Sequence, residues 1–256
     1  MKKLFKLIDL FDIKLSTIFL LFLSSLVGYI KPFLMYFFIA FIHEFSHLVV
    51  CIFYKLNIRK FLIIPFGAKL EVDNIDNVNS SKQIIIYLAG PASYFINLIW
   101  INLFLKLNLI NYVNYEFLSD ANLIMCLLNL LPIFPLDGFI VIKAFLQLIF
   151  PYKNVLKISM LIILFSFVAF AIYNIYDFQP IVLFFLLFEQ IKYFVFLKKS
   201  YKNFLIFKTM NKKEKKFKVI NDYNMYKDAN NYKIESQKVL NDSNIAQIEL
   251  KNIKFK

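Results

Sequence analysis

Long apolar runs separated by short polar connectors dominate the first 197 residues of the chain. A bilayer core about 30 Å thick needs about 20 apolar residues in a helix to cross it, and lipid excludes unpaired backbone, so apolar runs of this length form helices. The pattern therefore predicts an all-α membrane protein with six transmembrane helices. The six runs cover residues 13–30, 32–54, 83–105, 117–136, 155–176 and 180–197.

Two of the apolar segments contain residues that break helices. Residues 61–70 are too apolar for a solvated loop and yet include Pro65 and Gly67, and the fourth run ends in Pro132 and Pro135. Irregular backbone survives at membrane depth only where it is buried in protein or lines a wet cavity. We expect a short membrane-embedded extended segment between the second and third helices, and an interrupted helix after the fourth.

Composition and charge refine this prediction. Hydrophobic residues make up 60% of the 256 residues, whereas ordinary globular domains contain about 45–50%, so a soluble protein is excluded. Lysine and arginine favour the cytoplasmic side of a membrane protein, and here they gather in alternate connectors. We therefore expect a multi-pass protein of the cell membrane with both termini in the cytoplasm. The cytoplasmic set comprises Lys2, Lys3, Lys6, Lys55, Arg59, Lys60, Lys143, Lys153, Lys157, Lys198 and Lys199.

The composition changes at residue 198. Residues 198–256 contain 15 lysines and 6 acidic residues, which is +9 of the net charge of +13. We expect residues 1–197 to form the six-span membrane domain and residues 198–256 to form a small basic cytoplasmic tail, or a short regulatory module. The lipid bilayer is the expected partner of the tail, because anionic headgroups attract lysine. We expect no nucleic-acid partner.

The two histidines of the chain are four residues apart, in the sequence His43-Glu44-Phe45-Ser46-His47. On a helix, positions i and i+4 share one face, so two imidazoles can bind one zinc ion while the glutamate between them handles a proton. The motif lies inside the second apolar run, where ionisable groups are costly and usually functional. We expect one Zn²⁺ per chain, with His43 and His47 as ligands.

A catalytic zinc site usually has a third protein ligand and one open position. Asp137 is the favoured candidate, because it follows the helix-breaking prolines and precedes Gly138, and such backbone can bring its carboxylate into the helix bundle; a helix cap is the alternative. Glu189 in the last apolar run is a competitor, and Glu71 lies in a polar connector. Cys51 is excluded, because eight helical residues place it about 12 Å along the axis from His43.

A second segment of the sequence, taken together with the HExxH motif, resembles a known family. The segment Asn129-Leu-Leu-Pro-Ile-Phe-Pro-Leu-Asp137-Gly138 follows the HEFSH motif by some ninety residues, and it resembles the NxxPxxPxDG signature of the site-2 protease family of intramembrane zinc metalloproteases. The six-span layout is similar to the sporulation branch of that family, which processes a membrane-associated sigma-factor precursor. The resemblance covers residues 1 to about 197.

The resemblance implies a role for each residue that matches its motifs. His43, His47 and Asp137 are implied as the zinc ligands, Glu44 as the catalytic acid and base, and Asn129 as the asparagine of the active site. The segment from Pro65 to Gly67 is implied to lie near backbone that engages the substrate, and Ala89-Gly90-Pro91 also resembles a lesser motif of the branch.

The expected function is hydrolysis of a peptide bond in a membrane-tethered regulatory protein, a sigma-factor precursor or similar, near the cytoplasmic side of the membrane. Membrane inhibitor proteins are possible further partners. Two alternatives stay open. A CAAX-type membrane zinc protease shares the HExxH motif but takes a downstream glutamate, here Glu71 or Glu189, as its third ligand. A non-proteolytic zinc-binding sensor or transporter is expected to carry more histidines and carboxylates along several spans.

Overall fold

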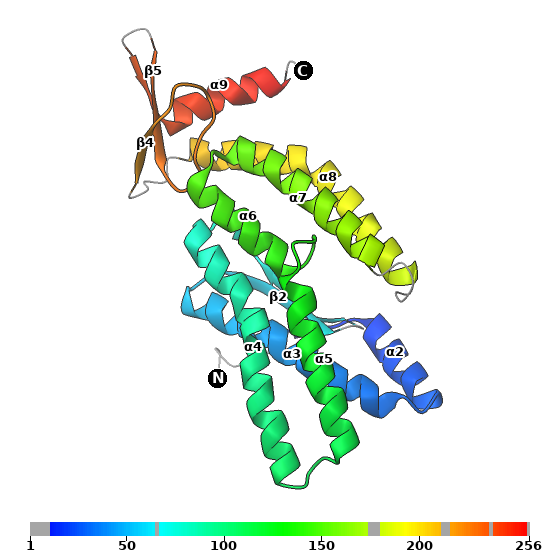
Figure 1. Ribbon diagram of the computed structural model, residues 1–256. Helices are drawn as coiled ribbons and strands as arrows, with labels where there is room; N and C mark the ends of the chain where they lie inside the picture. The colour runs from blue at the N-terminus through cyan, green and yellow to red at the C-terminus, as the bar shows by residue number, and fades with distance from the viewer. Residues whose placement is uncertain (1–10, 65–66, 174–179, 211–215, 236–237, 255–256) are drawn as a thin grey trace. The chain divides into compact units, whose positions relative to one another are not determined.

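A computed structural model describes the chain over residues 11–64, 67–173, 180–210, 216–235 and 238–254. The chain is mostly helical and divides into two compact units (Figure 1). The first unit contains residues 1–75 and 85–130, and the second contains residues 76–84 and 131–256.

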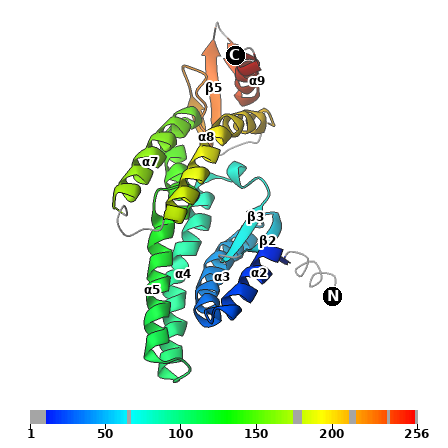
Figure 2. The same cartoon turned by 90° about the vertical axis from the view of Figure 1, so that its right-hand side faces the viewer.

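The first unit is built on long apolar helices: α2 (Leu15–Leu26), α3 (Ile30–Phe53), α5 (Tyr112–Leu130) and most of α4 (Ser80–Lys106). Helices α4 and α5 run side by side (Figures 1 and 2). Asn97 of α4 donates from Nδ2 to Oδ1 of Asn122 in α5 over 2.9 Å, and both side chains are buried. Because the hydrophobic effect does not drive association between apolar helices in lipid, such amide hydrogen bonds help to hold the two helices together.

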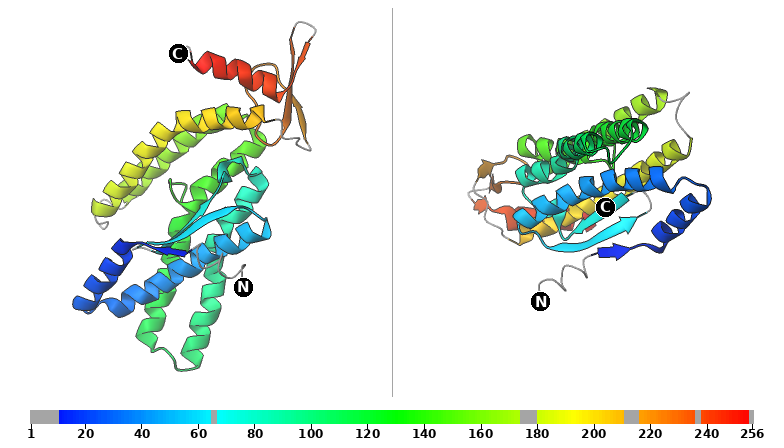
Figure 3. Two further views of the ribbon diagram at one scale, coloured as in Figure 1. Left: turned by 180° about the vertical axis from the view of Figure 1, so that it is seen from behind. Right: turned by 90° about the horizontal axis from the view of Figure 1, so that it is seen from below.

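A small sheet accompanies these helices and contains the predicted extended segment. Strands β1 (Phe11–Ile13), β2 (Ile58–Ile64) and β3 (Gly67–Val72) follow the order β1-β2-β3, with β1 parallel and β3 antiparallel to β2. Strand β3 packs along α3, as Figure 3 shows in blue and cyan. A Cβ on Gly67, whose φ is +136°, would lie 2.9 Å from the Cβ of Ala40, so a glycine permits this close approach. Pro65 and Phe66 lie outside the described residues.

The second unit begins where the proline-rich segment interrupts the helices. Helix α5 ends at Leu130, and α6 (Asp137–Ile149) begins after a non-helical stretch, as the prolines predict. Helices α7 (Tyr152–Tyr173) and α8 (Pro180–Thr209) follow and pack together. A 3-10 turn at Ile75–Asn77 precedes α4, whose first residue donates from Ser80 N to both carboxylate oxygens of Asp228.

The C-terminal tail folds into a small module that packs on α7 and α8 within the second unit. Strands β4 (Phe217–Val219), β5 (Asn230–Glu235) and β6 (Lys238–Leu240) form a sheet in the order β4-β5-β6, followed by α9 (Asp242–Lys254). Strand β4 is parallel and β6 antiparallel to β5. The apolar core of this module joins the tail to the end of α8 and the start of α7, and contains Tyr152, Leu156, Phe204, Leu205, Ile220, Met225, Ile245 and Ala246.

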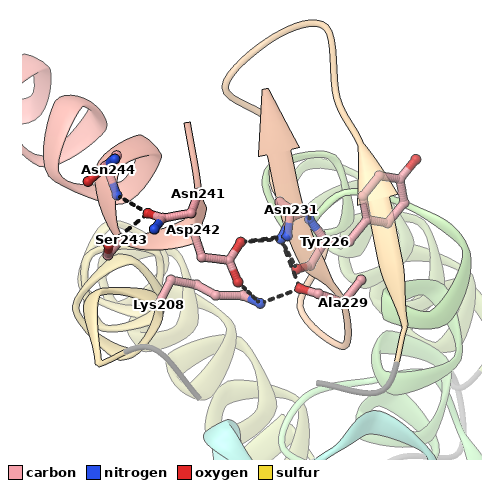
Figure 4. A network of polar contacts seen from close by, with 8 residues as sticks. All are labelled: Lys208, Tyr226, Ala229, Asn231, Asn241, Asp242, Ser243 and Asn244. Atoms are coloured by element: carbon pink, nitrogen blue, oxygen red, sulfur yellow. Dashed lines mark hydrogen bonds and ion pairs between the residues drawn. The ribbon is translucent and has the colours of Figure 1, made fainter. Parts of the chain in front are cut away.

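A buried polar network fixes the connection between α8, the sheet and α9 (Figure 4). Lys208 Nζ lies 3.2 Å from Oδ2 of Asp242 and 2.7 Å from the carbonyl oxygen of Ala229. Oδ1 of Asp242 accepts hydrogen bonds from the backbone N and the Nδ2 of Asn231, both over 2.8 Å. Because each buried charge has a partner of opposite charge and further hydrogen bonds, the network avoids the cost of an unpaired buried ion.

Three helices of the described chain are long and apolar enough to cross a membrane: α3, α4 and residues Tyr152–Ile172 of α7. Helix α2 is apolar but has only 12 residues, and the 19 residues of α5 include Glu116 and Asp120. The count of six spans therefore stays a prediction. The two sheets correct the all-α expectation. Extended backbone beside α3 and in the tail satisfies its N–H and C=O groups by hydrogen bonding to neighbouring strands.

Candidate metal centre

Helix α3 brings the two histidines and the glutamate of the HExxH motif together. One ligand atom from each of His43, Glu44 and His47 lies within 4.8 Å of the other two. The two imidazole rings are edge to face, with centroids 5.1 Å apart, and both histidines are buried. Two nitrogens that each bind zinc at about 2.0–2.1 Å must lie close together, so this group fits one zinc ion.

A hydrogen bond from the neighbouring helix fixes the tautomer of His47. Its Nδ1 lies 2.7 Å from the carbonyl oxygen of Ile86 in α4. A carbonyl oxygen only accepts hydrogen bonds, so Nδ1 carries the proton, and in the neutral imidazole Nε2 then carries the lone pair. Histidines that bind metals are commonly oriented in this way, by a partner on the second ring nitrogen. His47 is therefore prepared to bind a metal through Nε2.

Gly90 of α4 forms the opposite wall of the site. A Cβ built on Gly90 would lie 2.5 Å from Nε2 of His43 and closer still to Nε2 of His47. Both separations are below the 3.0 Å that a real Cβ keeps from its neighbours, so a methyl group at this position would push the two imidazoles away. The glycine therefore lets both Nε2 atoms lie directly against α4.

Glu44 contacts the sheet beside α3. The backbone N–H of Leu70 in β3 donates a hydrogen bond to Oε1 of Glu44. Strand β3 is an edge strand, paired with β2 on one side, and neighbouring N–H groups of a strand point to opposite sides. The Leu70 N–H therefore marks the side of β3 away from β2, and this edge, which pairs with no other described strand, faces the glutamate of the motif.

The other two predicted site residues lie at the ends of helices that flank the proline-rich segment. Asn129 is in the last turn of α5, in the first unit, where its Nδ2 donates to the carbonyl oxygen of Met125 over 2.9 Å. Asp137 is the first residue of α6, in the second unit, and Leu136 is the N-cap residue. Metal binding by Asp137 and a catalytic role for Asn129 stay predictions.

The competing ligand candidates have other surroundings. Glu189 is held by Lys192, whose Nζ lies 2.6 Å from its Oε1. Glu71 lies on β3 and is not part of the metal-binding group found among the described residues. Cys51 is fully buried in α3 and also stands outside that group, as the helix geometry predicts.

Sequence reasoning missed three contributors to the site. The carbonyl of Ile86 and the N–H of Leu70 are backbone groups, so no residue type marks them. In the sequence, Gly90 stands out only as part of the Ala89-Gly90-Pro91 motif. A glycine inside an apolar helix is nevertheless a recognisable sign that another group approaches closely.

Comparisons with known proteins agree with this geometry. No protein-family model matches the chain. The chain is 30% identical to stage IV sporulation protein FB of Bacillus subtilis over 120 residues, which are 45% of this chain and 40% of the relative. It is also 30% identical to a zinc metalloprotease of Methanocaldococcus jannaschii over 169 residues, 61% of this chain and 49% of the relative. The chain thus spans less than half the length of these relatives.

A solved structure shares the fold. The site-2 protease from Methanocaldococcus jannaschii superposes with a TM-score of 0.51 and 24% sequence identity, covering 71% of this chain and 87% of that one. The HExxH group and the orientation of His47 fit one zinc ion, and one of the relatives is named a zinc metalloprotease.

Proposed function

We propose that this chain is a member of the site-2 protease family, an intramembrane zinc metalloprotease that cleaves a membrane-tethered regulatory protein; its similarity to two relatives and to one solved structure supports this. The observation that carries this proposal is the pair of Nε2 atoms on His43 and His47, which both lie against Gly90, with Glu44 next to them. Two imidazoles and a nearby carboxylate are the groups that hydrolysis by a zinc protease requires.

Glu44 is the proposed acid and base. Bound zinc supplies Lewis acidity that activates water and polarises a carbonyl group. Glu44 takes a proton from the attacking water and later delivers a proton to the leaving amine. Its carboxylate already accepts a hydrogen bond from the Leu70 N–H. This contact orients the side chain, and its acceptor role fits an ionised carboxylate that serves as a base.

Asp137 is the proposed third zinc ligand, and Asn129 is the proposed donor to the oxyanion. Support for Asp137 comes from its position directly after the helix break, at the start of α6, and from the pairing of its competitor Glu189 with Lys192. An amide donor of this kind typically contributes about 3 kcal/mol to transition-state stabilisation.

The edge of β3 is the proposed binding site for the substrate backbone. A helical substrate hides its amide groups, so the segment to be cleaved must be extended, and an extended segment can add to an open strand edge. Among the described strands β3 pairs only with β2, and its other edge runs beside Glu44, which accepts the Leu70 N–H. A strand added there would carry its peptide bonds past the catalytic carboxylate.

The distribution of lysine and arginine along the chain indicates on which side of the membrane the reaction takes place. The proposed topology has six spans with both termini in the cytoplasm, and His47 lies eight residues before Lys55 on the predicted cytoplasmic side. Cleavage therefore occurs near the cytoplasmic face. The similarity to stage IV sporulation protein FB favours a sigma-factor precursor or a similar regulator as substrate, with membrane inhibitor proteins as further partners.

Co-expression with tagged, membrane-tethered candidate regulators tests the proposal. The native chain should shorten one of them, and Glu44→Gln should lower cleavage about 100-fold or more while keeping its zinc. Glu116→Gln, a glutamate on the exposed surface of α5, is the matched control and should cleave like the native chain. Undiminished cleavage by Glu44→Gln would exclude the proposed mechanism.

A further inference from the structure

The segment of residues 131–136, called the proline segment below, leads directly into Asp137, the proposed third zinc ligand. It forms a turn and not a helix, in which Leu136 N donates to the carbonyl oxygen of Ile133 over 2.8 Å. Its two prolines lack an N–H group, and backbone carbonyl groups away from water need a hydrogen-bond donor. The position of the segment therefore depends on donors from other elements of the second unit.

Helix α8 supplies such a donor from Gln190. Its Nε2 donates a hydrogen bond to the carbonyl oxygen of Phe134 in the proline segment, and lies 3.2 Å from the carbonyl oxygen of Leu186 in its own helix. Both neighbours are carbonyl oxygens, which only accept hydrogen bonds, so the nitrogen of the side-chain amide faces the segment. Gln190 thus joins α8 to the residue three positions before Asp137.

The other half of the Gln190 amide is buried at a cost. The side chain is 3% exposed and lies in the apolar run of residues 180–197, and its Oε1 has no hydrogen-bond partner within the described chain. A buried acceptor that stays unpaired lowers stability, and a polar side chain in an apolar membrane segment usually has a functional reason. The contact with the proline segment supplies that reason.

Aromatic packing fixes the same segment from the same helix. Tyr193 lies almost one turn after Gln190 on α8, and its ring centroid is 4.8 Å from that of Phe134. The Tyr193 ring also contacts Phe139, the third residue of α6, with centroids 5.2 Å apart, and both rings are buried. Helix α8 therefore contacts the chain on both sides of Asp137, in the segment before it and in the helical turn after it.

Helix α7 adds a further contact. Ser166 Oγ lies 2.7 Å from the carbonyl oxygen of Pro132 and also 2.7 Å from that of Ile162, one turn earlier in α7. A hydroxyl group has a single proton to donate, so Ser166 shares it between these two acceptors. The Ser166 contact with the proline segment is therefore weaker than the contact that Gln190 makes.

We propose that Gln190 is a positioning residue for Asp137: by holding the carbonyl group of Phe134, it fixes the turn from which Asp137 starts and thereby raises the zinc affinity of the site. The inference rests on the proposed role of Asp137 as a zinc ligand. Gln190 acts through Asp137 and is not itself a ligand. Loss of a group that orients a metal ligand typically lowers metal affinity 10–100-fold. Because Gln190 acts through the backbone, we expect the lower end of this range.

A double-mutant cycle on the full chain tests this. Zinc affinity is measured by competition with a chelating dye for the native chain, Gln190→Met, Asp137→Ala and the double variant. Methionine keeps the volume of glutamine but donates no hydrogen bond. We expect Gln190→Met to lower zinc affinity about tenfold in the native chain and to have no effect once Asp137 is alanine, since coupled residues are not additive.

Tyr193→Phe is the matched control. It lies on the same helix and removes a buried hydroxyl that has no hydrogen-bond partner within the described chain, while the ring stays. Native zinc affinity is expected, because only the ring contacts the proline segment. The melting temperature of each zinc-free variant shows whether it is folded. A purely structural role of Gln190 would lower that temperature without any coupling to Asp137.

The outcomes of the cycle separate this inference from the proposed function. Equal losses from Gln190→Met with and without the Asp137 carboxylate would overturn the inference. Native affinity in Gln190→Met beside a loss in Asp137→Ala would also overturn it and would leave the proposed third ligand intact. Native affinity in Asp137→Ala would refute that ligand, and the positioning role with it.

Ser166→Ala provides a milder version of the cycle if Gln190→Met does not fold. It removes the other side-chain contact to the proline segment, and we expect zinc affinity to fall about threefold with Asp137 present and to stay unchanged without it. Its control is Ser159→Ala, a fully buried serine two turns earlier on α7, which should keep native affinity. A threefold loss that persists in the Asp137→Ala chain would overturn the inference.

Discussion

Gly90 stands against His43 with no room for a side chain between them: a Cβ on the glycine would lie 2.5 Å from the histidine Nε2. Because the same Cβ would also meet Nε2 of His47, the missing side chain lets both imidazoles lie against α4. A residue outside the HExxH motif thus helps to fix the positions of both histidines.

Gly90→Ala should therefore lose zinc. The added methyl group clashes with both imidazoles and displaces them, so we expect zinc affinity to fall at least about tenfold, as for other changes next to metal ligands. Metal analysis of the purified protein measures this. Ala92→Val, two positions along α4 and exposed, adds volume away from the histidines and should keep normal zinc. A folded Gly90→Ala protein with full zinc occupancy would contradict the interpretation.

Leu70→Pro should separate zinc binding from cleavage. Proline lacks the N–H that donates to Glu44, and an edge strand tolerates proline where its N–H faces away from the sheet. We expect zinc content to stay normal while cleavage of a tethered substrate falls about tenfold or more, because Glu44 loses its orienting partner and the strand edge loses a donor. Leu70→Ala keeps the N–H and should retain activity, and equal activity of the two variants would argue against both roles.

Asp137→Ala should lower the zinc content, because a site with two histidines alone lacks its third protein ligand. The comparison is Glu189→Ala, which removes the carboxylate that is paired with Lys192 and should leave zinc unchanged. Metal occupancy of both variants, measured at the same free zinc concentration, distinguishes the two candidates. Normal occupancy in Asp137→Ala together with loss in Glu189→Ala would transfer the role to Glu189.

Lys208→Met should unfold the tail module without changing the metal centre. It leaves Asp242 buried without its counter-ion, a change that typically costs about 3–5 kcal/mol. We expect faster tryptic cleavage within residues 216–254, measured on the full chain, and normal zinc content. Lys208→Met combined with Asp242→Asn removes both charges and should regain part of the protection. Identical cleavage rates for the native chain and Lys208→Met would show that the pair adds no stability.

The grouping of His43 and His47 on α3 could be predicted because their relationship is local. His43 and His47 are four residues apart in an apolar run, and the periodicity of a helix is sufficient to place them on one face. The extended segment after that helix was also predictable, since glycine and proline interrupt an apolar stretch that is too short to span a bilayer.

The tail was predicted less completely. Its charge was plain from the sequence, but its fold depends on pairing between β4 and β5, which are separated by a segment without regular structure. The buried Lys208 and Asp242 lie 34 residues apart, so composition suggested lysines at the membrane surface where the structure forms an internal ion pair. Such contacts depend on the tertiary arrangement and leave no periodic signal.

By itself, then, the sequence determined a membrane protein with an HExxH helix, because length, hydropathy and i to i+4 spacing are properties of neighbouring residues. Only the tertiary structure decided which nitrogen of His47 faces the metal, since the carbonyl of Ile86 comes from another helix. It also decided that Gly90 lets both imidazoles lie against α4 and that Leu70 faces Glu44. These are contacts between backbone and side chains from separate elements, and packing alone brings such groups together.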